Sequence, residues 1–332
     1  MLKVAFIMES ENSISGYYRV AANLDAFERE GIDAYPMVLP VGLRQHRRMA
    51  RDLAVFDAVV YARALPGPVE FALIRRKAKV LGYDFDDVTV LNDGPSAEAV
   101  SVSGRLRFNT VVANADFITV ADEGLPELAG ARQGRISVVP TAVDTSRYTP
   151  REHHAGPPCI GWIGTRHTLR YLERVLPVVE RVAAARPGVT LTVICDGEPQ
   201  RKPFVRHVKL EQEVDPAEVA AFDVGLFPLP DTRWGRGQSG LPLALFGACG
   251  VPVVASPVGP GAKMVVDGKT GLFATGLAQW EKAILVLLDD ADRRNAFGMA
   301  AGKDAAAHYS AGVVIPHWAE ILKDMAARPR SG

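Results

Sequence analysis

Residues 236–259, RGQSGLPLALFGACGVPVVASPVG, place a glycine-containing loop before a helical segment and a short apolar strand. Pro242 suits the first turn of a helix, because its missing N–H would be unpaired there in any case. Gly250 ends this segment, and an apolar run from Val251 to Ala255 predicts a buried strand. A helix N-terminus with Arg236 beside it can bind an anion; a plain loop leading into a core helix is the alternative.

The chain's 332 residues exceed what one hydrophobic core usually serves, so we expect two domains. Lys plus Arg and Asp plus Glu both number 38, and this balance gives no reason to expect binding to nucleic acid. Cys159, Cys195 and Cys249 stand apart in or beside apolar runs, which indicates reduced, buried thiols rather than disulfides or a zinc site. The sequence starts directly with an apolar strand and holds no run of membrane-spanning length, so we expect a cytoplasmic protein.

Apolar strands alternate with helix-length segments along the chain, which is typical of parallel sheets covered on both faces. The strands expected in the first half are Leu2–Met8, Ala34–Leu39, Asp57–Ala62, Lys79–Tyr83, Phe117–Ala121 and Ile136–Pro140. Those expected in the second half are Cys159–Gly164, Val189–Cys195, Val205–Leu210, Asp223–Leu229, Val251–Ala255 and Gly271–Ala274. Helices are expected at Tyr17–Glu30, Gly104–Ala115, Leu277–Asp289, Asp292–His308 and from Val313 onward. The polar, proline-rich residues 141–158 predict a linker, so the fold class is α/β with two doubly wound domains.

Loops at the carboxyl ends of the strands are the expected ligand site, because doubly wound domains bind ligands there. Gly16 precedes a helix expected to begin near Tyr17 and adds a second glycine-led helix start. After the strand at 159–164, Arg166 and Arg170 are four residues apart and share a face if the helix has begun by then. Cations are unfavourable at a helix N-terminus unless an anion is bound, so this pair favours an anionic ligand over a solvated helix start.

Several segments resemble, in order and spacing, the retaining glycosyltransferases of family 4, whose fold is GT-B. They are SGYYRVAANLDAFEREGID at 15–33, NADFITVADEGLPEL at 114–128, RISVVPTAVDTSRYTP at 135–150, IGWIGTRHTLRYLERVLPVV at 160–179, LTVICDGEP at 191–199, the run from DVGLF to GLFA at 223–274, and YSAGVVIPHWAEIL at 309–322. The resemblance implies two Rossmann-like domains facing a central cleft. These are an acceptor-side domain at 1–145 and a donor nucleotide-sugar domain at 156–310, with a C-terminal helix at 311–332 that returns to the first domain.

The resemblance also implies that the loop amides and helix of the opening stretch hold the diphosphate of a sugar nucleotide. The residues it assigns to donor diphosphate binding are Gly16, Thr165, Arg166, Arg170, Arg236, Gln238, Ser239, Gly240 and Leu241. The family's phosphate-binding arginine and lysine fall on Thr165 and Arg170 respectively, and Arg166 and Arg236 are candidate substitutes for the missing cation.

Two departures from the family pattern concern recognition of the donor. The family's two glutamates, which contact the donor sugar and the nucleotide ribose, fall on Gly237 and Leu245. Gln238 stands where some relatives carry lysine, and a neutral amide is a weaker phosphate partner than a cation. The diphosphate site therefore carries over, whereas recognition of the ribose and the sugar does not.

The stretch YDFDD at 83–87 admits three interpretations. Aspartates after a strand hold a divalent metal in the other glycosyltransferase fold, but GT-B members need none, so no metal is expected. Register with the family puts Tyr83 and Asp84 near the acceptor side of the cleft, which makes them the candidate catalytic residues in contact with acceptor or donor sugar. The third interpretation is an acidic strand end, in which Asp84, Asp86 and Asp87 cap the next segment.

Residues 43–53, LRQHRRMARDL, predict a helix with one cationic stripe made of Arg44, Arg47, Arg48 and Arg51. Leu43, Ala50 and Leu53 share another face. Several family members act on lipid-linked acceptors and use such a helix on an anionic membrane, which would place this protein peripherally at the inner face of the membrane. A solvated helix face is the alternative.

The sequence thus predicts a metal-independent, retaining glycosyltransferase that moves a sugar from a nucleoside-diphosphate sugar to an acceptor hydroxyl. The product would be a glycan, a glycolipid or a glycosylated metabolite, and no cofactor besides the donor is expected. Two alternatives keep the fold. One is an epimerase acting on a UDP-sugar, and the other is a non-catalytic GT-B chain that lost both glutamates and serves as a partner of an active transferase.

Overall fold

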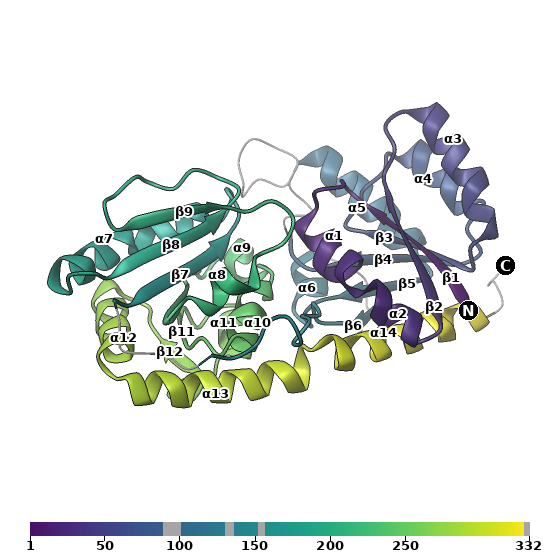
Figure 1. The fold of residues 1–332 in the computed structure, drawn as a ribbon. Coiled ribbons are helices and arrows are strands. Elements are labelled where there is room, and N and C mark those ends of the chain that lie inside the picture. Colours follow the sequence, from purple (N-terminus) through teal and green to yellow (C-terminus); the bar gives the residue numbers. More distant parts are fainter. Residues whose placement is uncertain (89–100, 130–135, 152–156, 329–332) are drawn as a thin grey trace. The chain divides into compact units, whose positions relative to one another are not determined.

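The computed structural model describes residues 1–88, 101–129, 136–151 and 157–328, and the chain divides into two compact units (Figure 1). Unit 1 comprises residues 1–142 and 311–332, and unit 2 comprises residues 143–310. The expected linker therefore belongs mostly to unit 2, although its residues 152–156 lie outside the described residues. Among the described residues, no helix combines the length and apolar character that crossing a membrane requires.

Unit 1 is built on one parallel sheet with the strand order β2-β1-β3-β4-β5-β6. Its strands are β1 (Leu2–Met8), β2 (Ile32–Val38), β3 (Ala58–Ala62), β4 (Leu81–Phe85), β5 (Phe117–Val120) and β6 (Ile136–Val138). All six overlap predicted strands, and the expected α/β class is confirmed. Ile7 pairs with Tyr61, and Tyr61 pairs with Tyr83, so these three side chains lie on one face of the sheet.

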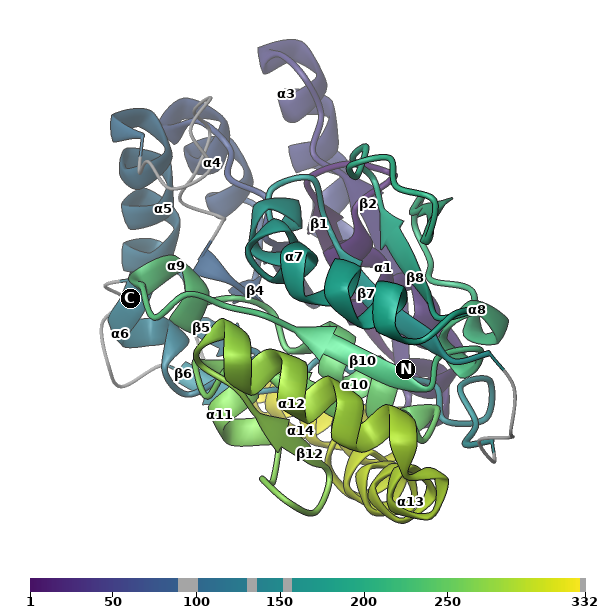
Figure 2. The same cartoon turned by 90° about the vertical axis from the view of Figure 1, so that its left-hand side faces the viewer.

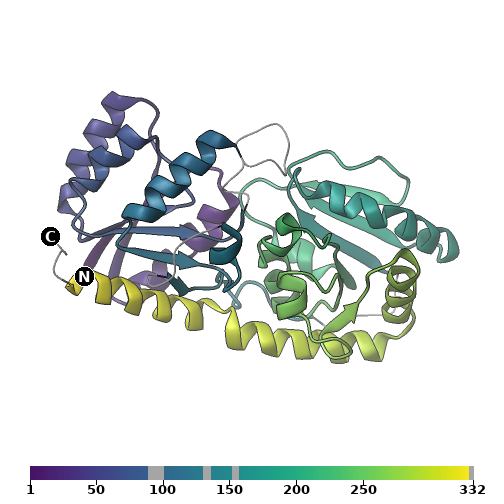
Figure 3. The same cartoon turned by 180° about the vertical axis from the view of Figure 1, so that it is seen from behind.

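Helices cover both faces of the unit 1 sheet (Figure 3). In chain order they are α1 (Ile14–Arg19), α2 (Leu24–Arg29), α3 (Leu43–Asp52), α4 (Pro68–Arg75), α5 (Val102–Asn114), α6 (Leu125–Ala129) and α14 (Ala311–Ala327). α2 and α14 share a core with Phe6, whose ring centroid lies 5.5 Å from those of both Phe27 and Trp318. α4 and α5 lie on the other face, where Phe71 and Phe108 pack against tyrosine rings of β3 and β4.

The single helix predicted over 17–30 is wrong, because the chain forms α1, a 3-10 turn at Ala21–Asn23 and then α2. α1 ends at Arg19, and the Asn23 side chain donates a hydrogen bond of 2.7 Å to the carbonyl of Tyr18. An asparagine amide that bonds a nearby backbone carbonyl offers an alternative to the helical ladder. The helix therefore stops, and α1 is a short, separate element at the carboxyl edge of β1.

Unit 2 repeats the architecture with the strand order β12-β11-β10-β7-β8-β9. Figure 2 labels β7, β8, β10 and β12 of this sheet. Its strands are β7 (Cys159–Gly164), β8 (Thr190–Cys195), β9 (Val205–Lys209), β10 (Val224–Phe227), β11 (Val253–Ala255) and β12 (Gly271–Phe273). Its helices are α7 (Leu169–Ala185), α8 (Pro216–Ala220), α9 (Arg233–Arg236), α10 (Leu241–Ala248), α11 (Pro260–Met264), α12 (Leu277–Asp289) and α13 (Ala291–His308). Every strand predicted for this half is present.

Close packing in unit 2 depends on glycines in two central strands. α7 and α12 share one hydrophobic core with the sheet. On the other face, a Cβ at Gly161 would lie 2.0 Å from the Phe222 ring, and one at Gly225 would lie 2.9 Å from the Phe246 ring. Glycine therefore lets α8 and α10 sit close to the sheet, which fixes where α10 begins.

The three cysteines are free thiols, as expected. Burial raises the pKa of Cys195 to about 11 and that of Cys249 to about 12. Cys159 is only half-buried and lies 3.3 Å from the Thr192 hydroxyl. The two buried thiols are thus held in their protonated form at neutral pH.

Candidate functional site

The loop after β7 forms a tight turn before α7. Thr165 N–H donates to the Thr168 hydroxyl at 2.9 Å, and the Thr165 carbonyl accepts from the amides of Thr168 and Leu169. α7 therefore begins at Leu169, so Arg166 precedes the helix and does not share a helical face with Arg170. The expected pairing of these two arginines is wrong, because the turn delays the helix by three residues.

The two arginines of this loop have different surroundings. Arg166 is exposed, and its backbone N–H and Nε donate to the Asp196 carboxylate at 2.6 and 3.0 Å. Arg170 is half-buried in the first turn of α7, and its guanidinium carbon lies 5.1 Å from the centroid of the Tyr171 ring. Arg170 is thus the more firmly positioned cation at this edge of unit 2.

The loop before α10 makes its own local contacts. The Thr232 hydroxyl caps α9 by accepting from Gly235 N–H at 3.2 Å. Arg236 lies 2.6 Å from an Asp231 carboxylate oxygen, and both side chains are exposed. The Gln238 amide donates to the Trp234 carbonyl at 3.0 Å, so its side chain is turned onto the loop backbone.

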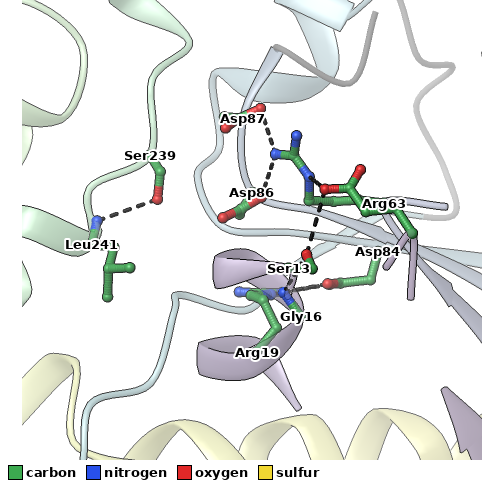
Figure 4. A network of polar contacts seen from close by, with 10 residues as sticks. Ser13, Gly16, Arg19, Arg63, Asp84, Asp86, Asp87, Ser239 and Leu241 are labelled. Carbon is green, nitrogen blue, oxygen red and sulfur yellow. Dashed lines mark hydrogen bonds and ion pairs between the residues drawn. The ribbon is translucent and has the colours of Figure 1, made fainter. Parts of the chain in front are cut away.

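The N-terminus of α10 lies at the carboxyl side of the unit 2 strands, as predicted from its sequence. Gly240 is the N-cap, and the Ser239 hydroxyl accepts from Leu241 N–H at 3.3 Å (Figure 4). Gly259 has a φ of +53°, and a Cβ there would lie 2.6 Å from the Arg236 carbonyl oxygen. A Cβ at Gly240 would clash with the Met264 sulfur of α11, so two glycine-dependent approaches hold the loop against α11.

Gly237 and Leu245, where the family pattern places two glutamates, lie in different surroundings. Gly237 is the buried C-cap of α9, in the loop that leads to α10. Leu245 is fully buried in α10 and packs in the core. A carboxylate at position 245 would face an apolar interior, so the chain has built hydrophobic packing where the family pattern places a ribose contact.

Gly16 lies inside α1 and not before it. α1 begins at Ile14 because the Ser13 hydroxyl accepts from the Gly16 N–H at 3.0 Å (Figure 4). The expectation of a helix start near Tyr17 is therefore wrong, and the Gly16 amide is already used by the cap. Glycine serves close packing here, because a Cβ would lie 2.7 Å from the Met8 sulfur.

The candidate catalytic residues Tyr83 and Asp84 are both fully buried on β4. Asp84 accepts from Nε and Nη2 of Arg19, at 2.9 Å for Nε, and from the Thr119 hydroxyl at 2.5 Å. Arg19 also donates to the Val139 carbonyl at 2.6 Å. Asp84 is thus a core carboxylate with its charge already compensated, and neither residue presents its side chain to solvent.

An arginine that the sequence interpretation did not single out organises the carboxyl edge of unit 1. Arg63 follows β3 with a φ of +59°, and its Nη1 lies 3.0 Å from Asp86 and 2.6 Å from Asp87 (Figure 4). Its Nε lies 3.7 Å from Glu9, at the end of β1. Burial alone would raise the pKa of Asp86, but Arg63 and Arg19 hold that pKa below its ordinary value.

These pairings bear on the three interpretations of residues 83–87. Among the residues that the structure describes, no group of three His, Cys, Asp or Glu side chains is arranged to hold a metal ion. Asp84 binds Arg19, whereas Asp86 and Asp87 bind Arg63. The segment that these aspartates were expected to cap includes residues 89–100, which lie outside the described residues.

The cationic stripe forms the exposed side of α3. Arg44, Arg47, Arg48 and Arg51 are all exposed and make no ion pair with the described part of the chain. The buried side carries Met49, Ala50 and Leu53. Leu43 was expected on that side but is 37% exposed, because it stands at the first residue of the helix.

Comparison with known proteins identifies the kind of enzyme. The sequence model of the family "Glycosyl transferases group 1" matches residues 157–290. The chain is 29% identical to D-inositol 3-phosphate glycosyltransferase of Nocardia farcinica over 93% of this chain and 78% of that one. It is 30% identical to D-inositol 3-phosphate glycosyltransferase 2 of Catenulispora acidiphila over 55% of this chain and 49% of that one.

Solved structures with low sequence identity share the fold. Sucrose-phosphate synthase of Thermosynechococcus elongatus has a TM-score of 0.74 at 14% identity, over 98% of this chain and 100% of that one. HepE of Anabaena, solved in complex with UDP-glucose, has a TM-score of 0.73 at 14% identity over the same shares. The architecture of two parallel six-stranded sheets is that of GT-B glycosyltransferases.

Proposed function

Since this chain is a group 1 glycosyltransferase with the GT-B fold, we propose that it takes its sugar from a UDP-sugar and transfers it with retention of configuration. The observation that carries the proposal is the N-terminus of α10, where Gly240 is the N-cap and Ser239 precedes it. Leu241 N–H, the first amide of the helix, donates to the Ser239 hydroxyl here and would turn to a bound diphosphate, whereas Pro242 has no N–H to offer. A helix N-terminus with glycine-led access is suited to a diphosphate. The complex of HepE with UDP-glucose supports the choice of nucleotide.

The chemistry follows from what these groups can stabilise. The bond between the anomeric carbon and the diphosphate oxygen breaks, and the α10 amides with Arg170 stabilise the negative charge that grows on the diphosphate. The acceptor hydroxyl forms the new bond on the same face of the sugar, and its proton passes to the departing diphosphate. This route needs neither a strong protein base nor a metal ion, which agrees with the burial of Asp84.

Release of UDP from UDP-glucose tests the proposal. We expect slow release without acceptor, because water can replace the acceptor hydroxyl, and no loss of rate in EDTA. Arg170→Ala should lower the rate, whereas Lys303→Ala, an exposed substitution on α13, should not. A converted sugar nucleotide without UDP release would indicate an epimerase. No binding of any sugar nucleotide would indicate the non-catalytic partner, which the loss of both glutamates favours.

The second part of the proposal concerns α3. Four exposed arginines and the neighbouring Val41 and Val55, which are 86% and 66% exposed, together offer cations and apolar side chains to an anionic membrane. Each arginine near such a surface contributes about 1 kcal/mol at physiological salt. The double variant Arg47→Glu/Arg51→Glu should abolish co-sedimentation with phosphatidylglycerol vesicles, while Lys303→Glu should leave it unchanged. Equal binding by both variants would contradict this part.

A further inference from the structure

Four neighbouring strands of the unit 2 sheet end on the same side as the start of α10. β12, β11, β10 and β7 are adjacent in the sheet, and each leads at its carboxyl end into a loop and then a helix. The helices are α12, α11, α9 followed by α10, and α7, respectively. The ribose of a nucleotide is joined to its diphosphate through one methylene group. A diphosphate bound at α10 therefore places the ribose beside these same loops.

The residues that follow these four strands include very few carboxylates. α7, α9, α10, α11 and α12 have no acidic residue in their first turns. In the four loops, all of which the structure describes, Asp231 is the one carboxylate, and it lies 2.6 Å from Arg236. Its side chain is 64% exposed, so a hydrogen bond to it competes with water and discriminates weakly between ligands. A carboxylate is the group that commonly accepts from a ribose hydroxyl in doubly wound nucleotide sites.

Uncharged polar side chains of the same loops bond their own backbone. Thr168, Thr232 and Ser256 each accept a hydrogen bond from a backbone N–H, at 2.9, 3.2 and 3.0 Å. The Gln238 amide donates to the Trp234 carbonyl at 3.0 Å. These side chains therefore hold the loops in their conformation, and turning one of them to a ribose hydroxyl would break a bond within the loop.

α10 itself offers a nucleotide only backbone groups. Its eight residues, LPLALFGA, include no polar side chain. Leu245 stands one turn after Leu241 on the same side of the helix, and helical side chains lean toward the N-terminus. This is where a longer polar side chain could reach toward the ligand, but Leu245 is fully buried in the core. The start of α10 can thus recognise negative charge, whereas its side chains cannot recognise a hydroxyl.

We propose that this site recognises the diphosphate and does not select for the ribose 2′-hydroxyl, so that 2′-deoxynucleoside-diphosphate sugars serve as donors as readily as UDP-sugars. The proposal rests on the proposed transferase function and extends its class of donor. A site whose buried polar groups pair with a hydroxyl rejects the analogue that lacks it, because those groups are then left unpaired. The described residues of these loops and of α10 include no buried carboxylate that would be left in that state.

Loss of the 2′-hydroxyl leaves the reacting bonds as they are. The bond between the anomeric carbon and the diphosphate oxygen breaks, and the acceptor hydroxyl supplies the oxygen of the new bond. Its proton passes to the departing diphosphate, as it does with a UDP-sugar.

Three nucleotides that differ by one group each test the proposal: UDP, its 2′-deoxy analogue dUDP, and UMP. Calorimetric titration of the full chain should give dissociation constants for UDP and dUDP that agree within about threefold, and binding of UMP about thirtyfold weaker or more. A loss of more than about threefold for dUDP would overturn the proposal. Equal binding of UMP and UDP would contradict recognition of the diphosphate.

Hydrolysis of UDP-glucose and of its 2′-deoxy analogue makes the same comparison for turnover. The two values of kcat/KM should again agree within about threefold, and a larger loss for the deoxy donor would count against the proposal.

An Asp231 variant tests the one carboxylate of these loops. Asp231→Asn should leave the ratio of the UDP and dUDP dissociation constants unchanged, whatever it does to both through Arg236. Glu211→Gln, which changes an exposed carboxylate after β9, is the matched control. A ratio that Asp231→Asn alone shifts in favour of dUDP would show that Asp231 contacts the 2′-hydroxyl, which contradicts the inference.

Failure of this inference differs from failure of the proposed function. If the site selects for the ribose, UDP still binds and UDP-glucose is still hydrolysed slowly, while dUDP and the deoxy donor fall behind. If the transferase function is wrong, UDP is not bound and neither donor is turned over.

Discussion

The two carboxyl edges of this enzyme hold their charges in different ways. In unit 1, the side chains of Arg19 and Asp84 are each 1% exposed and bind each other, and that of Arg63 is 11% exposed among three carboxylates. In unit 2, Arg166 and Arg236 pair with single aspartates at the surface. Buried pairs cannot separate without leaving an uncompensated charge, whereas exposed pairs separate at little cost. The charged side chains of unit 1 are therefore held in fixed positions, whereas the exposed arginines of unit 2 can leave their aspartates and turn toward an anion.

The largest expected effect is on the buried pair of unit 1. Asp84→Ala leaves Arg19 buried without its carboxylate and should lower the free energy of unfolding by about 3–5 kcal/mol. Arg236→Ala in unit 2 should leave that free energy unchanged within error. Urea unfolding followed by circular dichroism measures both. If both substitutions lowered the free energy of unfolding by similar amounts, the proposed difference between the two edges would be contradicted.

The next effect concerns the diphosphate. Arg170 is half-buried in the first turn of α7, so its guanidinium is positioned before the ligand arrives. Arg170→Ala should weaken UDP binding about thirtyfold, which corresponds to about 2 kcal/mol. Calorimetric titration gives the value, and Arg47→Ala on α3 is the control that should bind UDP normally. If Arg170→Ala changed the dissociation constant of UDP by less than twofold, Arg170 would have no part in binding the diphosphate.

A smaller effect is expected at Arg236, which must leave Asp231 before it can reach an anion. Arg236→Ala should weaken UDP binding about threefold, and Asp231→Ala should tighten it slightly by releasing the guanidinium. Opposite signs for the two variants in the same titration would sharpen the view that unit 2 redirects its arginines. The same sign for both would count against it.

The smallest effect is on acid stability. The pKa of Asp86 in unit 1 lies below its ordinary value because of Arg63 and Arg19, despite its burial, and that of Glu218 in unit 2 is lowered by Arg206. Carboxyl groups with lowered pKa stabilise the folded state above the unfolded pKa of about 4, and this stabilisation is lost as the pH falls through the folded pKa. Asp86→Asn should reduce the loss of unfolding free energy below pH 4 more than Glu218→Gln does. Unfolding curves between pH 2 and 5 would show the order, and a reversed order would contradict it.

Local patterns in the sequence predicted the strands and α10 well. Hydrophobic runs, Pro242 and Gly250 each determine the structure of residues that lie close to them in the sequence. The errors have a different origin. Asn23 ended α1 through a side-chain bond, and the turn at Thr165–Thr168 delayed α7. Arg63 was missed because its partners lie at the ends of two other strands, and no local pattern reveals them. A charged residue directly after the apolar run AVVYA is the signal that was available.

Calorimetric titration of the full chain with UDP in the presence of EDTA tests the central claim most directly, since it needs neither acceptor nor donor sugar. The account predicts saturable binding to one site without a divalent ion, about thirtyfold weaker in Arg170→Ala and unchanged in Arg47→Ala. Binding that appears only when Mg²⁺ is added, or that Arg170→Ala leaves unaltered, would contradict it.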